Sequence, residues 1–162
     1  MQPLVILQLL ILLFLANGAP VVVQRACGDR FSFPLDGGIS FIDGQRLLGA
    51  SKTVRGILSS ILVTSASAPL VGLDWKVGAI VGSTAMVGDL CSSFVKRRLR
   101  LAPGTKATGL DQIPESLFPL LLCRPMLALT FADIVVGVVL FLIGEIMLSR
   151  LLFKLGVRTH PY

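Results

Sequence analysis

One acidic residue and a basic cluster share a face of a predicted helix within an apolar stretch of the chain. Asp89 lies roughly 9 Å before the end of that stretch at Val95, because a helix advances about 1.5 Å per residue. Lys96 follows on the same face, and Arg97 and Arg98 lie beside it. A carboxylate can hold Mg²⁺ while cations hold phosphates, so the pattern indicates a catalytic site for a metal ion and a nucleotide.

Simpler interpretations remain open for the same residues. A buried ion pair with Lys or Arg would also account for Asp89. The KRRLR run at 96–100 taken alone would be a set of charges that fixes the orientation of a membrane span. The chemical interpretation depends on the carboxylate and the cations occurring together.

Asp111 is the predicted second metal ligand. It follows the segment LAPGTKATGL, in which Pro103 and Gly104 predict a turn, and it precedes another apolar stretch. This position would let Asp111 reach the same site as Asp89, whereas the alternative is a solvated surface carboxylate. Glu115 fits the first turn of the next helix, where a negative charge is favourable.

An earlier connector, PLDGGISFIDGQRLLGASKTVRG, is dense in Gly, Asp and cations and indicates a phosphate-binding loop. Asp36 and Asp43 are candidates for metal or polar contacts, and Lys52 and Arg55 for phosphate contacts. It is not a Walker A motif, because the Lys-Thr pair comes two residues too late and no strand context exists. Ordinary turn glycines and orienting cations are the alternative.

Small and polar residues extend the predicted site along the helix that carries Asp89. Gly78 and Gly82 form a GxxxG pair, which lets another helix approach closely. On a helical wheel they fall within about 40° of Asp89 and Ser93, so this stripe, Ser93 included, is expected to face the bundle interior. Asn17, in the first apolar stretch, is expected to face the bundle because a buried amide needs a hydrogen-bond partner in a membrane, and it is a candidate substrate contact.

The composition excludes an ordinary soluble enzyme. The chain has 162 residues, of which 54% are hydrophobic and only 15% charged. At about 20 residues per crossing, this length leaves no room for a separate soluble domain, so we expect one integral-membrane domain over residues 1–162. The net charge of +6 is attributed to loops on one side of a membrane, and no nucleic-acid partner is expected.

The expected fold is an all-α membrane protein, a bundle of five transmembrane helices with two motif-rich cytoplasmic loops. The first apolar stretch is interpreted as a retained helix, because the residues before it lack the basic charges of a secretory signal. Asp133 and Glu145 lie in the last stretch, and their roles stay undecided. The five apolar stretches are Leu4–Val23, Ile57–Leu73, Val77–Val95, Pro114–Leu129 and Phe131–Phe153.

Positive charges set the expected orientation. Thirteen of the fifteen Lys and Arg residues fall after the first, third and fifth stretches, and only Lys76 and Arg124 lie elsewhere. The positive-inside rule then predicts a multi-pass protein of the cytoplasmic membrane, with the N-terminus outside, the C-terminus inside and the site facing the cytoplasm.

Few nucleophilic or metal-binding side chains are available. The three cysteines are scattered and His160 is the single histidine, which argues against a structural zinc site, a disulfide framework and catalysis by a Ser-His-Asp or Cys-His group.

These motifs in combination resemble a known family. GDLCSSFVKRR followed by PG and LDQ is similar to the signature of bacterial CDP-diacylglycerol synthases. ANGAP, PLDGG, DGQRLLG, SKTVRG and LDQIPE extend the resemblance over nearly the whole chain, to the small five-span CDP-archaeol synthases. The sequence reads PGTKATG where the longer diacylglycerol enzymes carry a histidine, which favours the archaeol branch.

The resemblance implies a Mg²⁺-dependent cytidylyltransferase that joins CTP to a membrane lipid phosphate, such as 2,3-bis-O-(geranylgeranyl)glycerol 1-phosphate, and releases pyrophosphate. It implies Asp89 and Asp111 as metal ligands, Ser93 as a polar site residue, and Lys96 and Arg97 as contacts to the nucleotide phosphates. A phosphatidate cytidylyltransferase, a small transporter and a non-catalytic scaffold are the alternatives. The oligomeric state and the number of metal ions stay open.

Overall fold

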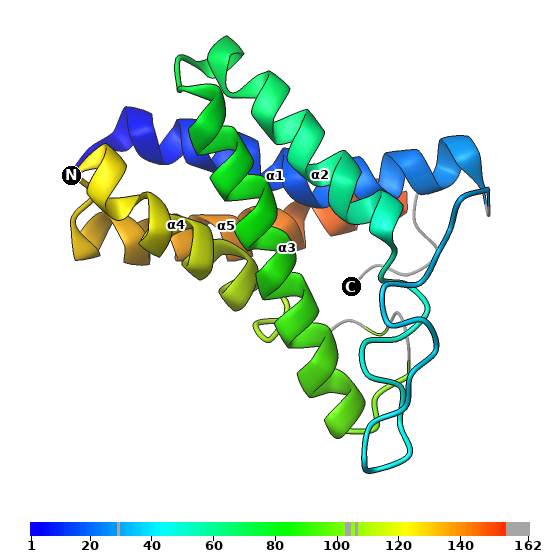
Figure 1. Cartoon of the computed structure of the whole chain (residues 1–162). Coiled ribbons are helices and arrows are strands. Elements are labelled where there is room, and N and C mark those ends of the chain that lie inside the picture. The colour runs from blue at the N-terminus through cyan, green and yellow to red at the C-terminus, as the bar shows by residue number, and fades with distance from the viewer. Residues whose placement is uncertain (29, 103–104, 106, 155–162) are drawn as a thin grey trace.

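The computed structural model describes residues 1–28, 30–102, 105 and 107–154, with side chains up to residue 150. Five α-helices and one short 3₁₀ helix form the fold, and the described residues contain no β-strand, only two isolated bridges. The predicted all-helical fold is therefore confirmed (Figure 1). The elements are α1 (Pro3–Cys27), α2 (Val54–Ser67), η1 (Pro69–Val71), α3 (Trp75–Arg98), α4 (Gln112–Leu127) and α5 (Phe131–Lys154).

Four of these helical segments are long and apolar enough to cross a membrane: Pro3–Cys27, Val54–Val71, Trp75–Arg98 and Phe131–Arg150. The remaining helix, α4, has 16 residues. That length rises only about 24 Å, less than the roughly 30 Å of a bilayer's hydrocarbon core. The chain is thus a multi-pass membrane protein in which the fourth predicted stretch forms a shorter helix.

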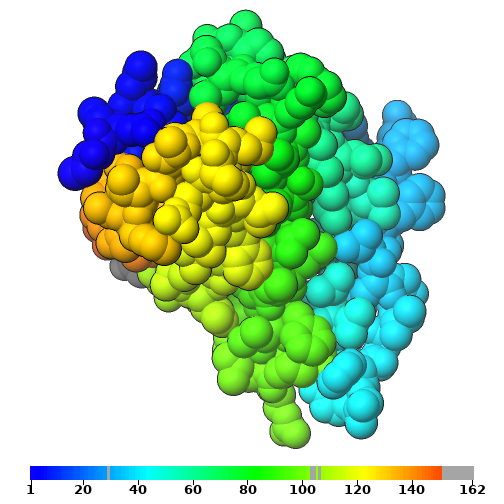
Figure 2. All heavy atoms as spheres, turned by 60° about the vertical axis from the view of Figure 1, so that its left-hand side comes forward, coloured from blue at the N-terminus to red at the C-terminus, as the bar shows by residue number. Residues whose placement is uncertain are grey.

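Long connectors lie at one end of the bundle. Residues 28–53 join α1 to α2 and residues 99–111 join α3 to α4, and we call this the loop end. Figure 2 shows the first connector, in blue to cyan, projecting beside the end of α3 in green. The turn predicted at Pro103 and Gly104 lies outside the described residues, as do Lys106, Arg158 and His160.

Glycines bring α3 into direct contact with α2 and with α4. A side chain at Gly78 or Gly82 would collide with α2, reaching within 2.8 Å of the Ser65 Cα and 2.9 Å of the Ile61 Cα respectively. The predicted close approach at the GxxxG pair is therefore confirmed. Gly88 does the same toward α4, since a Cβ there would lie 2.7 Å from the backbone nitrogen of Glu115.

The apolar core lies mainly toward the other end of the bundle, where α1 packs against α3 and α5. Leu9, Leu12 and Leu13 of α1 are almost completely buried, as are Val81 of α3 and Phe141 of α5. This rigid core fixes the directions in which the helices run toward the loop end.

Asp36 organises the first connector. Its buried carboxylate accepts hydrogen bonds from the backbone nitrogens of Gly38 (3.1 Å), Leu48 (3.2 Å) and Gly49 (2.9 Å), and from the Arg46 guanidinium (2.7 Å). Burial alone would raise the pKa of Asp36, but these hydrogen bonds outweigh it and lower the pKa from 3.8 to about 2. The ionised carboxylate therefore stabilises the folded loop.

Arg98 fastens this loop to α3. Its guanidinium lies 4.6 Å from the ring centre of Phe41 and 4.9 Å from that of Phe94, and it donates to Asp43 (2.8 Å) and to the carbonyl of Arg46 (2.8 Å). Cation–π contacts and an ion pair together hold the loop beside the end of α3.

We expect Asp36→Asn to loosen residues 36–49, because the neutral amide loses the charge-assisted hydrogen bonds. The lowered pKa corresponds to about 2 kcal/mol of loop stability that is present above pH 4 and is lost as the pH falls toward 2. Hydrogen exchange at neutral pH should be faster in residues 36–49 of the variant and unchanged in the α1 core. Equal exchange in both proteins would contradict the role of Asp36.

Gly88→Ala should destabilise the fold, because its methyl group would push the start of α4 away from α3. We expect a melting temperature lower by several degrees. Gly18→Ala is the matched control, since nothing lies within 4 Å of a Cβ at Gly18 in α1. Equal melting temperatures for Gly88→Ala and the control would show that the helices do not depend on this contact.

Candidate active site

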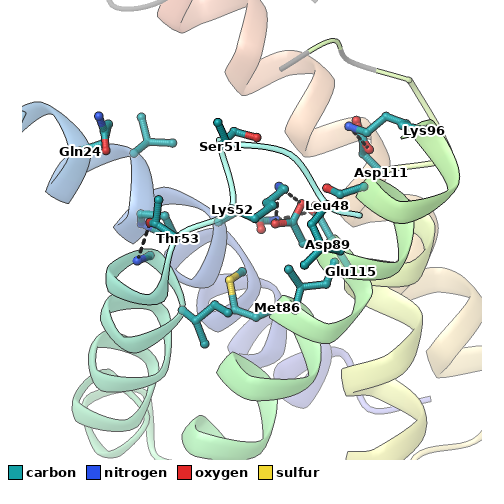
Figure 3. A pocket seen from close by; sticks show the side chains of 18 of the residues that line it. Gln24, Leu48, Ser51, Lys52, Thr53, Met86, Asp89, Lys96, Asp111 and Glu115 are labelled. Atoms are coloured by element: carbon teal, nitrogen blue, oxygen red, sulfur yellow. Dashed lines mark hydrogen bonds and ion pairs between the residues drawn. The ribbon is translucent and has the colours of Figure 1, made fainter. Parts of the chain in front are cut away.

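A cavity of about 1000 Å³ opens at the loop end, with walls from all five α-helices and both long connectors. Figure 3 shows polar side chains from helices distant in sequence turned toward this space. The residues predicted from sequence that line it are Asn17, Lys52, Asp89, Ser93, Lys96, Arg97 and Asp111.

Asp89 is paired with Lys52. The Lys52 Nζ lies 2.6 Å from one carboxylate oxygen of Asp89 and 2.5 Å from the other (Figure 3). Lys52 immediately precedes Thr53, whose side chain accepts a hydrogen bond from the Gly56 nitrogen and caps α2. The start of α2 therefore positions the lysine, and α3 positions the aspartate.

Asp111 is paired with Lys96 in the same way. The Lys96 Nζ lies 2.7 Å from Asp111 Oδ1 and also donates to the Thr105 carbonyl at 3.0 Å. The other carboxylate oxygen of Asp111 accepts from the Ala107 nitrogen at 3.1 Å. Both side chains are mostly buried, at 8% exposure for Lys96 and 13% for Asp111, so this ion pair is shielded from solvent.

Glu115 is a buried acid next to Asp89. Its place in this site was not predicted from the sequence. It accepts a hydrogen bond from Asn17 Nδ2 at 2.8 Å, lies within hydrogen-bonding reach of Asp89, and interacts electrostatically with Glu145 of α5. The close approach at Gly88 explains its position. An acid within an apolar stretch, the signal that singled out Asp89, could have identified it. Asn17, predicted as a substrate contact, is a partner of Glu115 here.

Two polar groups in the cavity wall are left with spare hydrogen-bonding capacity. Arg97 is buried and donates to the Ala102 carbonyl at 2.9 Å, while its Nε has no partner among the described residues. The buried hydroxyl of Ser93 likewise has no partner within the described part of the chain. Because buried polar groups are normally satisfied, both fit contacts to a bound ligand.

Four predicted substrate contacts do not line the cavity: Asp36, Asp43, Arg55 and Arg98. Asp36, Asp43 and Arg98 hold the first connector together and attach it to α3, as described above. Arg55 ties the start of α2 to the end of α1, donating to the Gly28 carbonyl at 3.0 Å and also to Gln24 and Arg30. In this structure these charges support the loop end instead of facing a substrate.

The charges around the cavity balance. Its described lining carries four acids (Asp89, Asp111, Glu115, Glu145) and four bases (Arg25, Lys52, Lys96, Arg97). No group of three or more His, Cys, Asp or Glu side chains with metal-binding geometry occurs among the described residues. The oxygen donors nevertheless fit Mg²⁺, which binds proteins through one or two carboxylates and fills its other positions with water and phosphate oxygens.

The chain matches the CarS-like family, described as CDP-archaeol synthase, over residues 3–76 and 71–162. A CDP-archaeol synthase of Thermofilum pendens is 37% identical over 159 residues, which covers 92% of this chain and 76% of that protein. A CDP-archaeol synthase of Sulfurisphaera tokodaii is 32% identical over 153 residues, covering 91% and 89% respectively.

A solved structure has the same fold. It is described as an intramembrane enzyme for archaeal membrane lipids biosynthesis and superposes with a TM-score of 0.70 at 28% identity, covering 86% of this chain and 91% of its own. The sequence match along nearly the whole chain, the helical bundle and the charged cavity at its loop end agree with one another. This chain belongs to the CDP-archaeol synthase family.

Proposed function

We propose that this chain transfers the cytidylyl group of CTP to the phosphate of a membrane lipid with ether-linked isoprenoid chains, of the type 2,3-bis-O-(geranylgeranyl)glycerol 1-phosphate. The observation that carries this proposal is the cavity at the loop end, where the helices and connectors of a chain of this family bring together four acids and four bases. A nucleotide and a lipid headgroup can meet there.

The reaction needs no nucleophile from the protein. A phosphate oxygen of the lipid attacks the α-phosphorus of CTP, a new P–O bond forms, and the bond to the β-phosphate breaks to release pyrophosphate. A phosphate monoester has a second pKa of about 6, so the attacking group is mostly ionised at neutral pH. Positioning of the two substrates and neutralisation of their charge are what remain for the enzyme.

The lining residues suit these two tasks. Lys52, Lys96 and Arg97 supply positive charge for the phosphates, and the Ser93 hydroxyl, which has no partner among the described residues, adds a hydrogen bond. Asp89 and Asp111 would hold Mg²⁺, which neutralises developing charge on the transferred phosphoryl group.

The membrane arrangement supports entry of the lipid from the side. The cavity lining includes apolar side chains of α1, α2 and α3, among them Val21, Ile57 and Met86, next to the polar residues. Positive charges concentrated near the loop end favour a cytoplasmic orientation of that end by the positive-inside rule. The proposed site therefore faces the cytoplasm, where CTP is available.

Asp89→Asn and Asp111→Asn should each reduce CTP-dependent lipid activation at least a hundredfold, because each removes a charge proposed to hold the metal. Turnover of labelled CTP in detergent measures this. Asp74→Asn is the control, since Asp74 caps α3 at the opposite end and asparagine caps equally well. Unchanged turnover in both site variants would remove the metal assignment.

The ether lipid phosphate should be the better substrate. We expect 2,3-bis-O-(geranylgeranyl)glycerol 1-phosphate to be converted with a higher kcat/KM than phosphatidic acid when both are assayed in the same micelles. Equal or faster conversion of phosphatidic acid would instead identify an enzyme for ester lipids.

A further inference from the structure

The two carboxylates proposed to hold the metal are each occupied by a lysine. Lys52 contacts both oxygens of Asp89, at 2.6 and 2.5 Å, and Lys96 lies 2.7 Å from Asp111. An ammonium group against a carboxylate takes the place that a divalent cation would need. Metal binding therefore requires that these ion pairs open.

Both lysines line the cavity. Lys52 lies one residue before the end of the first connector and its side chain is 21% exposed, whereas that of Lys96 is 8% exposed. A lysine carries its charge on a flexible four-carbon chain and lacks the fixed geometry of a bidentate arginine pair. A rotation of the side chain is enough to exchange one anionic partner for another.

Charge balance indicates when this exchange occurs. The described lining carries equal numbers of acids and bases, so a divalent cation alone would add uncompensated positive charge. CTP alone would add negative charge beside four carboxylates. A lysine that left its carboxylate without a new anion nearby would leave partly buried charges unpaired, which is costly.

We propose that Lys52 and Lys96 guard the metal-binding carboxylates, and that they release Asp89 and Asp111 to the divalent cation as they transfer to the phosphates of CTP. The inference rests on the proposed function. In this scheme Lys52, Lys96 and the two aspartates each keep an oppositely charged partner before and after binding. The metal and the nucleotide then bind cooperatively, and the lysines carry the coupling between them.

The test measures binding of Mn²⁺ alone to the full-length protein in detergent, by the EPR signal of the free ion and without nucleotide. Lys52→Met should bind Mn²⁺ about tenfold more tightly than the wild type, because the competing cation is gone. Lys52→Arg should bind Mn²⁺ as weakly as the wild type, since arginine can keep the pair with Asp89. Lys76→Met, in an exposed position at the opposite end of α3, is the control.

The second arm measures CTP binding in the presence of saturating Mn²⁺. Lys52→Met should weaken CTP binding about tenfold, opposite in sign to its effect on the metal. If Lys52 had only a structural role, its replacement would weaken the binding of both Mn²⁺ and CTP. Lys96→Met should show the same opposed effects through Asp111, and it serves as the test if Lys52→Met does not fold.

The outcomes separate this inference from the proposed function. If Mn²⁺ binding depends on Asp89 in the wild type but Lys52→Met and Lys96→Met do not tighten it, the guarding role is wrong and the metal site stands. If Asp89→Asn leaves Mn²⁺ binding unchanged, both the metal site and the exchange are wrong.

Discussion

The structure depends on pairing charges that the helices bring together at one end of a membrane bundle. Acids from α3, α4, α5 and the second connector and bases from α1, α3 and the first connector surround one cavity, and each of the proposed metal ligands has a lysine within ion-pair distance. Unpaired charges at such depth would oppose folding. The same pairing provides the opposite charges that a metal-bound nucleotide requires, so the requirement for stability and the requirement for binding coincide.

Close helix packing makes this pairing possible. Gly88 allows the backbone of α4 to lie directly on α3, which brings Glu115 to Asp89, and Asn17 of α1 then completes the contact. Asp36 and Arg98, by contrast, act through the connector. They give the loop a fixed shape and attach it to α3, so that Lys52 approaches Asp89 from a defined direction.

Helical periodicity explains what could be predicted from the sequence. It placed Asp89, Ser93 and Lys96 on one face, and all three line the cavity. It could not reveal the Lys52–Asp89 or Asn17–Glu115 contacts, which join residues 37 and 98 positions apart. Nor could it distinguish Asp36, buried within its own loop, from Asp111, which faces the cavity, since both are aspartates near glycines in polar connectors. The fourth apolar stretch, which at Pro114–Leu129 is short for a full crossing, forms the 16-residue helix α4.

The most direct test asks whether a divalent cation held by Asp89 and Asp111 also binds the phosphates of the nucleotide. Electron–nuclear double resonance of Mn²⁺ bound together with a non-hydrolysable CTP analogue would report the phosphorus nucleus of any phosphate whose oxygen coordinates the ion. The account predicts a phosphorus-31 hyperfine coupling in the wild-type protein that disappears in Asp89→Asn. A bound ion without that coupling, or a coupling that persists in the variant, would contradict it.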